Sequence, residues 1–223
     1  MLNRCADKTL PWDCSFDMRK FFILVFMLFG SVAQGAEEPT ILIFGDSLSA
    51  GYGIEVDQSW TALLQARLQS QGYEHQVINA SISGETTEGG AARIEAAVER
   101  FDPELVILEL GGNDGLRGFP PERLQDNLEQ IITASKDSGA KVVLLGIRIP
   151  LNYGPRYSSA FEAAFRDAAA SQDVAWIEFF MEGVALNEEM MQDDGIHPNA
   201  DAQILLLDNA WPIISDALGA RLD

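Results

Sequence analysis

Ser47 and His197 are the two residues of this sequence whose side chains could perform covalent chemistry together. A serine hydroxyl is a weak nucleophile and needs a base within hydrogen-bond reach, most often a histidine that a carboxylate orients. The sequence has two histidines. His75 begins an apolar run, residues 75–79, that predicts a strand, so it is expected at the end of the sheet opposite to the polar motifs that follow the strands. This leaves His197 as the candidate base. Asp194 precedes His197 by three residues across Gly195. Its carboxylate can curl back to the ring Nδ1, which leaves Nε2 to take the serine proton.

Both residues also have an ordinary structural interpretation. An Asp-Ser pair between glycines, as at Ser47, is typical of turns, in which most serines form only local hydrogen bonds. Residues 193–195, Asp-Asp-Gly, are likewise typical of a turn, with a surface histidine beside it. Pro198 disfavours a helix at His197, and Asn199 can cap the helix that follows, so the imidazole is expected on a fixed loop.

A serine that attacks an acyl carbon needs preorganised donors for the oxyanion that develops. The candidate donors are the backbone N–H of Ser47, the backbone N–H of Gly84 and the side-chain amide of Asn113. Gly84 lets the backbone approach a substrate closely, and Asn113 can project from the tight turn GGNDG, although each alone is also an ordinary turn residue. The acid next to the serine, Asp46, is expected to brace the serine loop.

Short apolar runs alternate with stretches of helical period along the chain. The runs predict strands whose continuous apolar pattern indicates burial on both faces, at residues 40–44, 75–79, 105–110, 142–147 and 174–177. Five helix faces lie between or after them, and the last is marked by Ile204, Leu207, Trp211, Ile214 and Leu218. This order predicts one α/β domain over residues 37–223, with three α/β/α layers and a five-stranded parallel sheet. The polar motifs follow strands, at the sheet edge where ligands bind.

Residues 1–36 are predicted to be a secretory signal peptide. Arg19 and Lys20 precede the apolar stretch FFILVFMLFG, and small residues follow up to a cleavage zone at Gly35 or Ala36. The apolar stretch is shorter than the roughly 20 residues that span a bilayer, although a membrane anchor is the alternative interpretation. Met18 directly precedes the charged region, so translation can start there, in which case residues 1–17 do not belong to the protein.

Cleavage would change the composition of the mature protein. Both cysteines, Cys5 and Cys14, would be removed, which excludes disulfides, thiol catalysis and cysteine zinc sites. The formal net charge would move from −19 to −20, and such a surface repels nucleic acid and anionic membranes. We therefore expect a periplasmic or secreted monomer, with no nucleic-acid partner and no stable membrane anchor after cleavage.

Four sequence blocks together resemble the SGNH or GDSL family of serine hydrolases, over roughly residues 40–218. They are GDSLS around Ser47, Gly84 in SISGET, Asn113 in GGND, and the pair Asp194-x-x-His197. The stretches ELGGNDGLRG, NYGPRY and QDDGIHPNADAQ are most similar to periplasmic members that act as thioesterases, lysophospholipases and esterases. The resemblance implies a flavodoxin-like fold with Ser47 as nucleophile, His197 as base and Asp194 as its orienting acid. It also implies an oxyanion hole of Ser47, Gly84 and Asn113, with no metal and no cofactor.

The same resemblance implies small-molecule or lipid ester substrates: fatty acyl esters, lysophospholipids, acyl-CoA thioesters and aryl esters. Apolar residues of two loops either line an acyl groove or pack the loops, namely Leu116, Phe119, Ile149, Leu151 and Tyr153. One alternative is a carbohydrate O-acetyl esterase of the same family, which would prefer an acetylated sugar to p-nitrophenyl octanoate. The other is a non-catalytic anion-binding module at residues 45–53, which the lack of Lys and Arg in that loop disfavours.

Overall fold

The computed structural model describes residues 38–219, so the predicted signal peptide lies outside the described residues. Five parallel strands form one sheet in the order β2-β1-β3-β4-β5. This order is that of flavodoxin-like folds, which confirms the predicted fold class. The strands are β1 (Thr40–Gly45), β2 (Gln76–Asn79), β3 (Leu105–Glu109), β4 (Lys141–Leu145) and β5 (Ala175–Ile177).

The three central strands form the middle of the hydrophobic core. Every residue of β3 is buried, as are five of the six residues of β1 and four of the five of β4. The edge strands β2 and β5 contain no buried residue. An edge strand has a neighbour on one side only, so the layers of helices cover it incompletely. The predicted burial on both faces is therefore confirmed for the central strands and wrong for β2 and β5.

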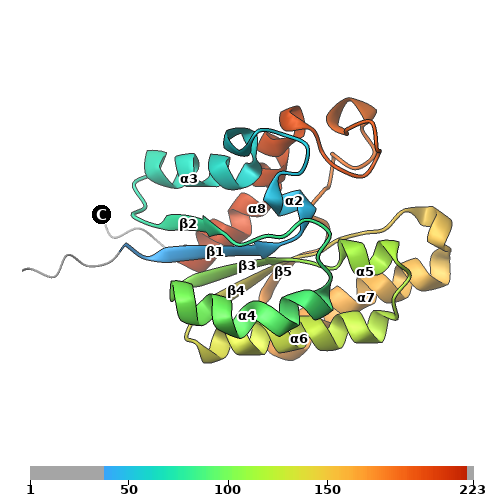
Figure 1. The fold of residues 1–223 in the computed structure, drawn as a ribbon, viewed down its shortest axis with the longest axis horizontal. Coiled ribbons are helices and arrows are strands. Elements are labelled where there is room, and N and C mark those ends of the chain that lie inside the picture. Colours follow the sequence, from blue (N-terminus) through green and yellow to red (C-terminus); the bar gives the residue numbers. More distant parts are fainter. Residues whose placement is uncertain (1–37, 220–223) are drawn as a thin grey trace, which may run out of the picture. The chain divides into compact units, whose positions relative to one another are not determined.

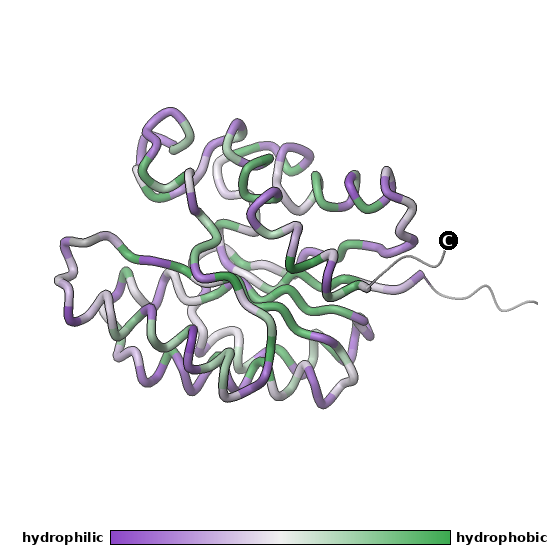
Figure 2. The backbone as a smooth tube through the Cα atoms, turned by 180° about the vertical axis from the view of Figure 1, so that it is seen from behind, coloured by the Kyte–Doolittle hydropathy of each residue, from purple (hydrophilic) through white to green (hydrophobic). Residues whose placement is uncertain are grey.

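Helices cover both faces of the sheet (Figure 1). The helices α4, α6 and α7 pack together on one face, and α3 and α8 pack together on the other. Figure 2 shows the hydrophobic strands between these layers, with hydrophilic residues along the outer sides of the helices. The helices are α2 (Ser47–Ala50), α3 (Trp60–Ser70), α4 (Thr87–Phe101), α5 (Gly112–Leu116), α6 (Pro121–Asp137), α7 (Pro155–Gln172) and α8 (Gln203–Leu218), with 3₁₀ helices η1 (Val56–Gln58), η2 (Leu151–Tyr153), η3 (Glu188–Met190) and η4 (Ala200–Ala202).

The buried face of α8 differs from the predicted one. Ile204, which was expected to mark that face, is 49% exposed, whereas Leu207 and Ile214 are buried as expected. Gln203 takes the buried place in the first turn, and its side-chain oxygen accepts the backbone N–H of Trp60 at 3.0 Å. A polar residue that caps a neighbouring helix cannot be identified by an apolar pattern, which explains the error.

The polar loops meet at the C-terminal edge of the sheet. β1 pairs with both neighbours in a register that aligns Ile43 with Asn79 and Gly45 with Glu109, so these three strands end at about the same level. β1 leads into α2, β2 into residues 80–86, and β3 into α5. The predicted site residues in these loops are therefore presented at one edge.

Candidate active site

His197 lies between Ser47 and Asp194. Its Nε2 is 2.9 Å from the Ser47 Oγ, and its Nδ1 is 2.6 Å from the Asp194 Oδ2. A carboxylate can only accept hydrogen bonds, so Nδ1 carries the proton of the neutral ring and Nε2 faces the serine as an acceptor. The structure thus brings together the three residues expected to form a triad, from positions 150 residues apart in the sequence.

The histidine loop is built by local hydrogen bonds. The other oxygen of Asp194 accepts the backbone N–H groups of Ile196 and His197, at 2.9 and 3.0 Å. Gly195 adopts a φ of +64°, a left-handed conformation that glycine reaches without strain and that folds the loop back on itself. Asn199 accepts the N–H groups of residues 201 and 202 and so caps η4, which confirms its predicted role.

These bonds also set the charge of Asp194. The backbone N–H of His197, its ring N–H and the backbone N–H of Ile196 lower the pKa of Asp194 from 3.8 to about 2. The carboxylate therefore stays ionised in neutral and mildly acidic solution. A negative charge beside Nδ1 favours the tautomer that presents an acceptor to Ser47.

The serine loop is braced by Asp46, as predicted. Asp46 is the N-cap of α2, and its Oδ1 accepts the backbone N–H of Leu48 at 3.1 Å. Its Oδ2 accepts the side-chain amide of Asn113 at 3.1 Å. Ser47 opens the helix that Asp46 caps, so these bonds fix the backbone on both sides of the serine.

Gly84 lies in the loop after β2, and Asn113 lies in the short helix α5 after β3, both at this edge. One amide hydrogen of Asn113 is used by Asp46, and the second is available for a ligand. Gly84 has a φ of +80°, and apart from its chain neighbours no described residue places an atom within 4 Å of where a Cβ would stand, so this side of Gly84 is open. The Gly84 carbonyl accepts a hydrogen bond from the Arg117 guanidinium at 2.9 Å. Arg117 follows α5 and so links the Gly84 loop to the Asn113 loop.

A buried carboxylate, not singled out by the sequence analysis, joins the same two loops. Asp114 is 2% exposed and accepts both the backbone N–H of Thr87, at 2.9 Å, and its hydroxyl, at 2.6 Å. The start of α4 is thereby tied to α5. The only signal in the sequence was the acid directly after Asn113, which resembles any polar turn residue.

A second buried acid, Glu109, lies beneath the serine loop. It ends β3, is fully buried, and its Oε2 accepts the hydroxyl of Ser49 at 2.7 Å. A Cβ on Gly45 would lie 2.8 Å from that same oxygen, so the two strands can approach only with glycine at this position. Burial, together with the nearby Asp46, raises the pKa of Glu109 well above its usual range. Burial likewise raises the pKa of Asp46 from 3.8 to about 6.

The raised pKa of Asp46 predicts a pH dependence of stability. A carboxyl whose folded-state pKa lies above its unfolded value binds extra protons in the native state, so its contribution is present below about pH 4 and lost as the pH rises through about 6. The free energy of unfolding should therefore fall across that window, by on the order of 3 kcal/mol from this one residue. Urea unfolding at pH 4, 5, 6 and 7 measures this slope.

The Asp46→Asn protein is expected to show a shallower slope over the same window. Asparagine does not titrate, and loss of the Asp46 charge also lowers the pKa of Glu109, so both effects make the slope shallower. The matched control is Asp137→Asn, at an exposed acid on α6, and it should keep the parental slope. Equal slopes for the parent and Asp46→Asn would contradict the prediction.

Tyr52 covers the imidazole. The rings of Tyr52 and His197 have centroids 4.5 Å apart and are tilted by 37°, and Tyr52 is 52% exposed. The Tyr52 ring shields one face of the imidazole while remaining open to solvent. Sequence analysis gave no indication of this contact, because a tyrosine in a glycine-rich loop has no period or motif that marks it.

The residues expected to line an acyl groove occupy two loops near α5. Ile149 is 6% exposed and packs against Gly115, and the hydroxyl of Tyr153 donates to the Leu116 carbonyl at 2.8 Å. These contacts are loop packing, one of the two roles left open for them. Phe119 is partly exposed beside Arg123, whose guanidinium carbon is 5.4 Å from its ring centroid, and the backbone of Leu151 lies in η2.

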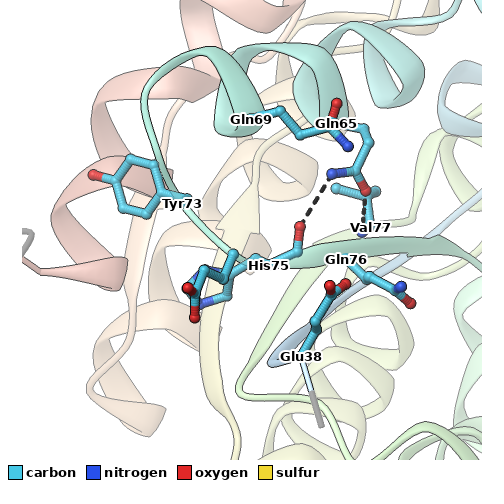
Figure 3. A pocket seen from close by; sticks show the side chains of 8 residues that line it. Glu38, Gln65, Gln69, Tyr73, His75, Gln76 and Val77 are labelled. Carbon is cyan, nitrogen blue, oxygen red and sulfur yellow. Dashed lines mark hydrogen bonds between the residues drawn. The ribbon is translucent and has the colours of Figure 1, made fainter. Parts of the chain in front are cut away.

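A cavity of about 320 Å³ lies at the other end of the sheet (Figure 3). His75 lines it, and its Nε2 is 3.2 Å from a carboxylate oxygen of Glu104. Gln65 reaches over the start of β2, donating to the His75 carbonyl at 3.0 Å and accepting the Val77 N–H at 2.7 Å, as Figure 3 shows. His75 is therefore remote from the polar loops, as the sequence analysis predicted.

Two further properties concern only residues 38–219. In this range no three side chains of His, Cys, Asp or Glu are grouped as ligands of a metal ion. No helix of the same range has the length and apolarity needed to cross a membrane.

The sheet order and the Ser–His–Asp arrangement at its C-terminal edge define an α/β serine hydrolase. The model of the GDSL-like Lipase/Acylhydrolase family matches residues 43–203, most of the described domain. The chain belongs to this family and is a hydrolase acting on ester bonds.

Relatives with similar sequences and structures carry names of the same kind. The chain is 49% identical to Esterase TesA of Pseudomonas aeruginosa, over 84% of this chain and 93% of the relative. It is 46% identical to Thioesterase 1/protease 1/lysophospholipase L1 of Escherichia coli K12, over 84% and 87%. The crystal structure of the esterase EstA from Pseudoalteromonas sp., inhibited by monoethylphosphonate, superposes with a TM-score of 0.78 at 41% identity, covering 81% of this chain and 99% of EstA.

Proposed function

We propose that Ser47 is the nucleophile of this hydrolase, His197 its general base and then acid, and Asp194 the residue that orients the imidazole. The observation that carries the proposal is the position of His197, with Nε2 2.9 Å from the serine oxygen and Nδ1 2.6 Å from the carboxylate. Both distances lie within the range of a nucleophile and base ready for proton transfer.

The reaction then follows two steps. The Ser47 oxygen attacks the acyl carbon as its proton moves to Nε2 of His197, and collapse of the tetrahedral intermediate expels the alcohol or thiol, which leaves with that proton. A water molecule, activated by the same Nε2, attacks the acyl-serine, and the carboxylic acid is released as Ser47 regains its proton. A fluorophosphonate probe tests the first step, because it should label Ser47, as identified by mass spectrometry of the labelled peptide.

The oxyanion hole of this proposal is formed by the backbone N–H groups of Ser47 and Gly84 and the free amide hydrogen of Asn113. The hydrogen bond from the Asn113 amide to Asp46 supports it, because this bond holds the amide beside the residue that precedes Ser47. The open space beside the Gly84 Cα supports it as well, because a substrate can approach this residue closely. Donors fixed before the reaction require no reorganisation when charge develops.

Removing the Asn113 donor should slow catalysis without abolishing it. For Asn113→Ala we expect kcat to fall about 10²- to 10³-fold with little change in KM, because the donor meets a charge that exists only in the transition state. Asn209→Ala is the matched control, since that amide binds the carbonyls of residues 180 and 182 and should leave kcat within about threefold of the parent. A parental kcat for Asn113→Ala would exclude this residue from the oxyanion hole.

The substrates we propose are esters and thioesters of fatty acids, including lysophospholipids, acyl-CoA and aryl esters. The names of the two relatives support this class. Leu116, Phe119, Ile149, Leu151 and Tyr153 are proposed to shape the acyl groove, directly or by holding its walls. A chain-length series over p-nitrophenyl esters, acyl thioesters and lysophospholipids tests the class, and a preference for acetylated sugars would favour the O-acetyl esterase alternative instead.

We also propose that the mature enzyme is a periplasmic or secreted monomer. The leader-like residues 1–36 and the strongly acidic composition support export and the lack of a nucleic-acid partner. N-terminal sequencing of the exported protein should locate the cleavage after Gly35 or Ala36. Light scattering of that protein measures its mass.

A further inference from the structure

The side chain of Gln192 connects the loop that carries Ser47 with the loop that carries His197. Its Nε2 donates to the carbonyl of Tyr52 at 2.7 Å and to the carbonyl of Pro198 at 2.9 Å. An amide nitrogen has two hydrogens, so each carbonyl receives one. Two carbonyls as neighbours also fix the orientation of the amide, because its oxygen would be repelled by both.

Each end of this bridge is tied directly to a residue of the triad. On one side, the backbone N–H of Tyr52 donates to the carbonyl of Ser47 at 3.2 Å, and the Tyr52 ring lies against the His197 imidazole. On the other side, the backbone N–H of Gln192 itself donates to the carbonyl of His197 at 2.8 Å. A short path of hydrogen bonds thus runs from the backbone of Ser47 through Gln192 to the backbone of His197.

The serine loop leaves space for this amide. Gly53 follows Tyr52 with a φ of +76°, and a Cβ at this position would lie 2.1 Å from the Gln192 Oε1. Any larger residue at position 53 would displace the glutamine. The loop therefore accommodates the bridge only with glycine at this position.

We infer that Gln192 is a positioning residue that sets the distance between the Ser47 Oγ and the His197 Nε2. The inference rests on the proposed function of these two residues. The two loops are far apart along the chain and are held together only by contacts in the folded domain. A misplacement of about 1 Å between reacting groups can lower a rate about 10²-fold. A bridge between the two backbones opposes that displacement.

Gln192→Met tests this inference, because methionine has nearly the same length and no hydrogen-bond donor. We expect kcat and the second-order rate constant of fluorophosphonate labelling to fall together by about 10- to 100-fold, with KM within about twofold of the parent. The final labelled fraction should equal that of the parent. Gln125→Met, at a glutamine of α6 whose side chain donates to Glu129, is the matched control and should match the parent in every measurement.

Gly53→Ala reaches the same contact from the other loop. Its methyl group should displace the Gln192 amide, so a similar fall in the labelling rate constant is expected. In the double variant Gly53→Ala/Gln192→Ala the clashing side chain is removed, so the labelling rate constant should fall no further than in the worse of the two single variants. Such non-additivity is expected of residues that act through one contact. Fully additive losses would overturn the inference.

Two other outcomes would also overturn it. A parental labelling rate constant in Gln192→Met would show that the bridge does not position the triad. A smaller labelled fraction with a parental rate constant would show that Gln192 only stabilises the fold. Failure of the parent itself to be labelled at Ser47 would instead contradict the proposed function, so the two failures can be distinguished.

Discussion

Replacing Ser47 by alanine is expected to lower kcat for ester hydrolysis by about 10⁶-fold, the loss measured when the nucleophile of another serine hydrolase is removed. The reason is that, among the described residues, the hydroxyl next to the His197 Nε2 is that of Ser47, at 2.9 Å. Without the nucleophile, hydrolysis must proceed by direct attack of water, helped only by substrate binding and the oxyanion donors. Hydrolysis of p-nitrophenyl butyrate measures the effect.

The fold should survive this change. Ser47 is half-buried and does not belong to the hydrophobic core. The midpoint of thermal unfolding should therefore stay within a few degrees of the parent, as is usual for substitutions outside the core. Ser138→Ala, at the end of α6, removes a hydroxyl far from the imidazole and should leave kcat within about threefold of the parent. Turnover by Ser47→Ala at the parental rate would exclude Ser47 as the nucleophile.

Asp194→Asn should give the second large loss, about 10³- to 10⁴-fold in kcat. The asparagine oxygen can still accept the backbone N–H groups of Ile196 and His197, which places its NH₂ group against the ring Nδ1. The ring would then carry its proton on Nε2 and face Ser47 with a donor. We expect the lower part of the range, because the Asp194 side chain is 37% exposed and water partly screens its charge.

The matched control for this prediction is the adjacent acid. Asp193 is exposed, so Asp193→Asn should keep kcat within about threefold of the parent while removing the same formal charge. The rate constants of phosphonate labelling should fall in parallel with kcat for Asp194→Asn. A larger loss of kcat in Asp193→Asn than in Asp194→Asn would contradict the prediction and show that Asp193, not Asp194, orients the imidazole.

The fold was predictable because strands and helices leave periodic signals. The apolar runs located all five strands within two residues, and the double proline at 120–121 located the start of α6. The arrangement of Ser47, His197 and Asp194 was predictable for another reason: of the two histidines in the sequence, only His197 stands in one of the polar motifs. Parallel strands then required those motifs to meet at one edge.

Contacts that depend on three-dimensional packing were not predictable. Glu109 lies in an apolar run and Asp114 in a motif typical of a turn, and neither pattern reveals the partners Ser49 and Thr87. Gln192 is one amide among many in the sequence. Its inferred role depends on two carbonyls, that of Tyr52, 140 residues away along the chain, and that of Pro198, which follows after a turn. Such roles follow from distances, which no pattern of residue types encodes.

The distance along the chain between the serine and its histidine also affects how the enzyme matures. The imidazole is supplied by the segment shortly before α8, the last helix described, so it is among the last parts of the domain to be synthesised. Under the proposed mechanism, Ser47 therefore gains its base only when the segment that carries His197 has docked onto the rest of the domain. Newly made chains are expected to be inert toward esters until that moment, and the time at which a phosphonate first reacts should mark the completion of folding.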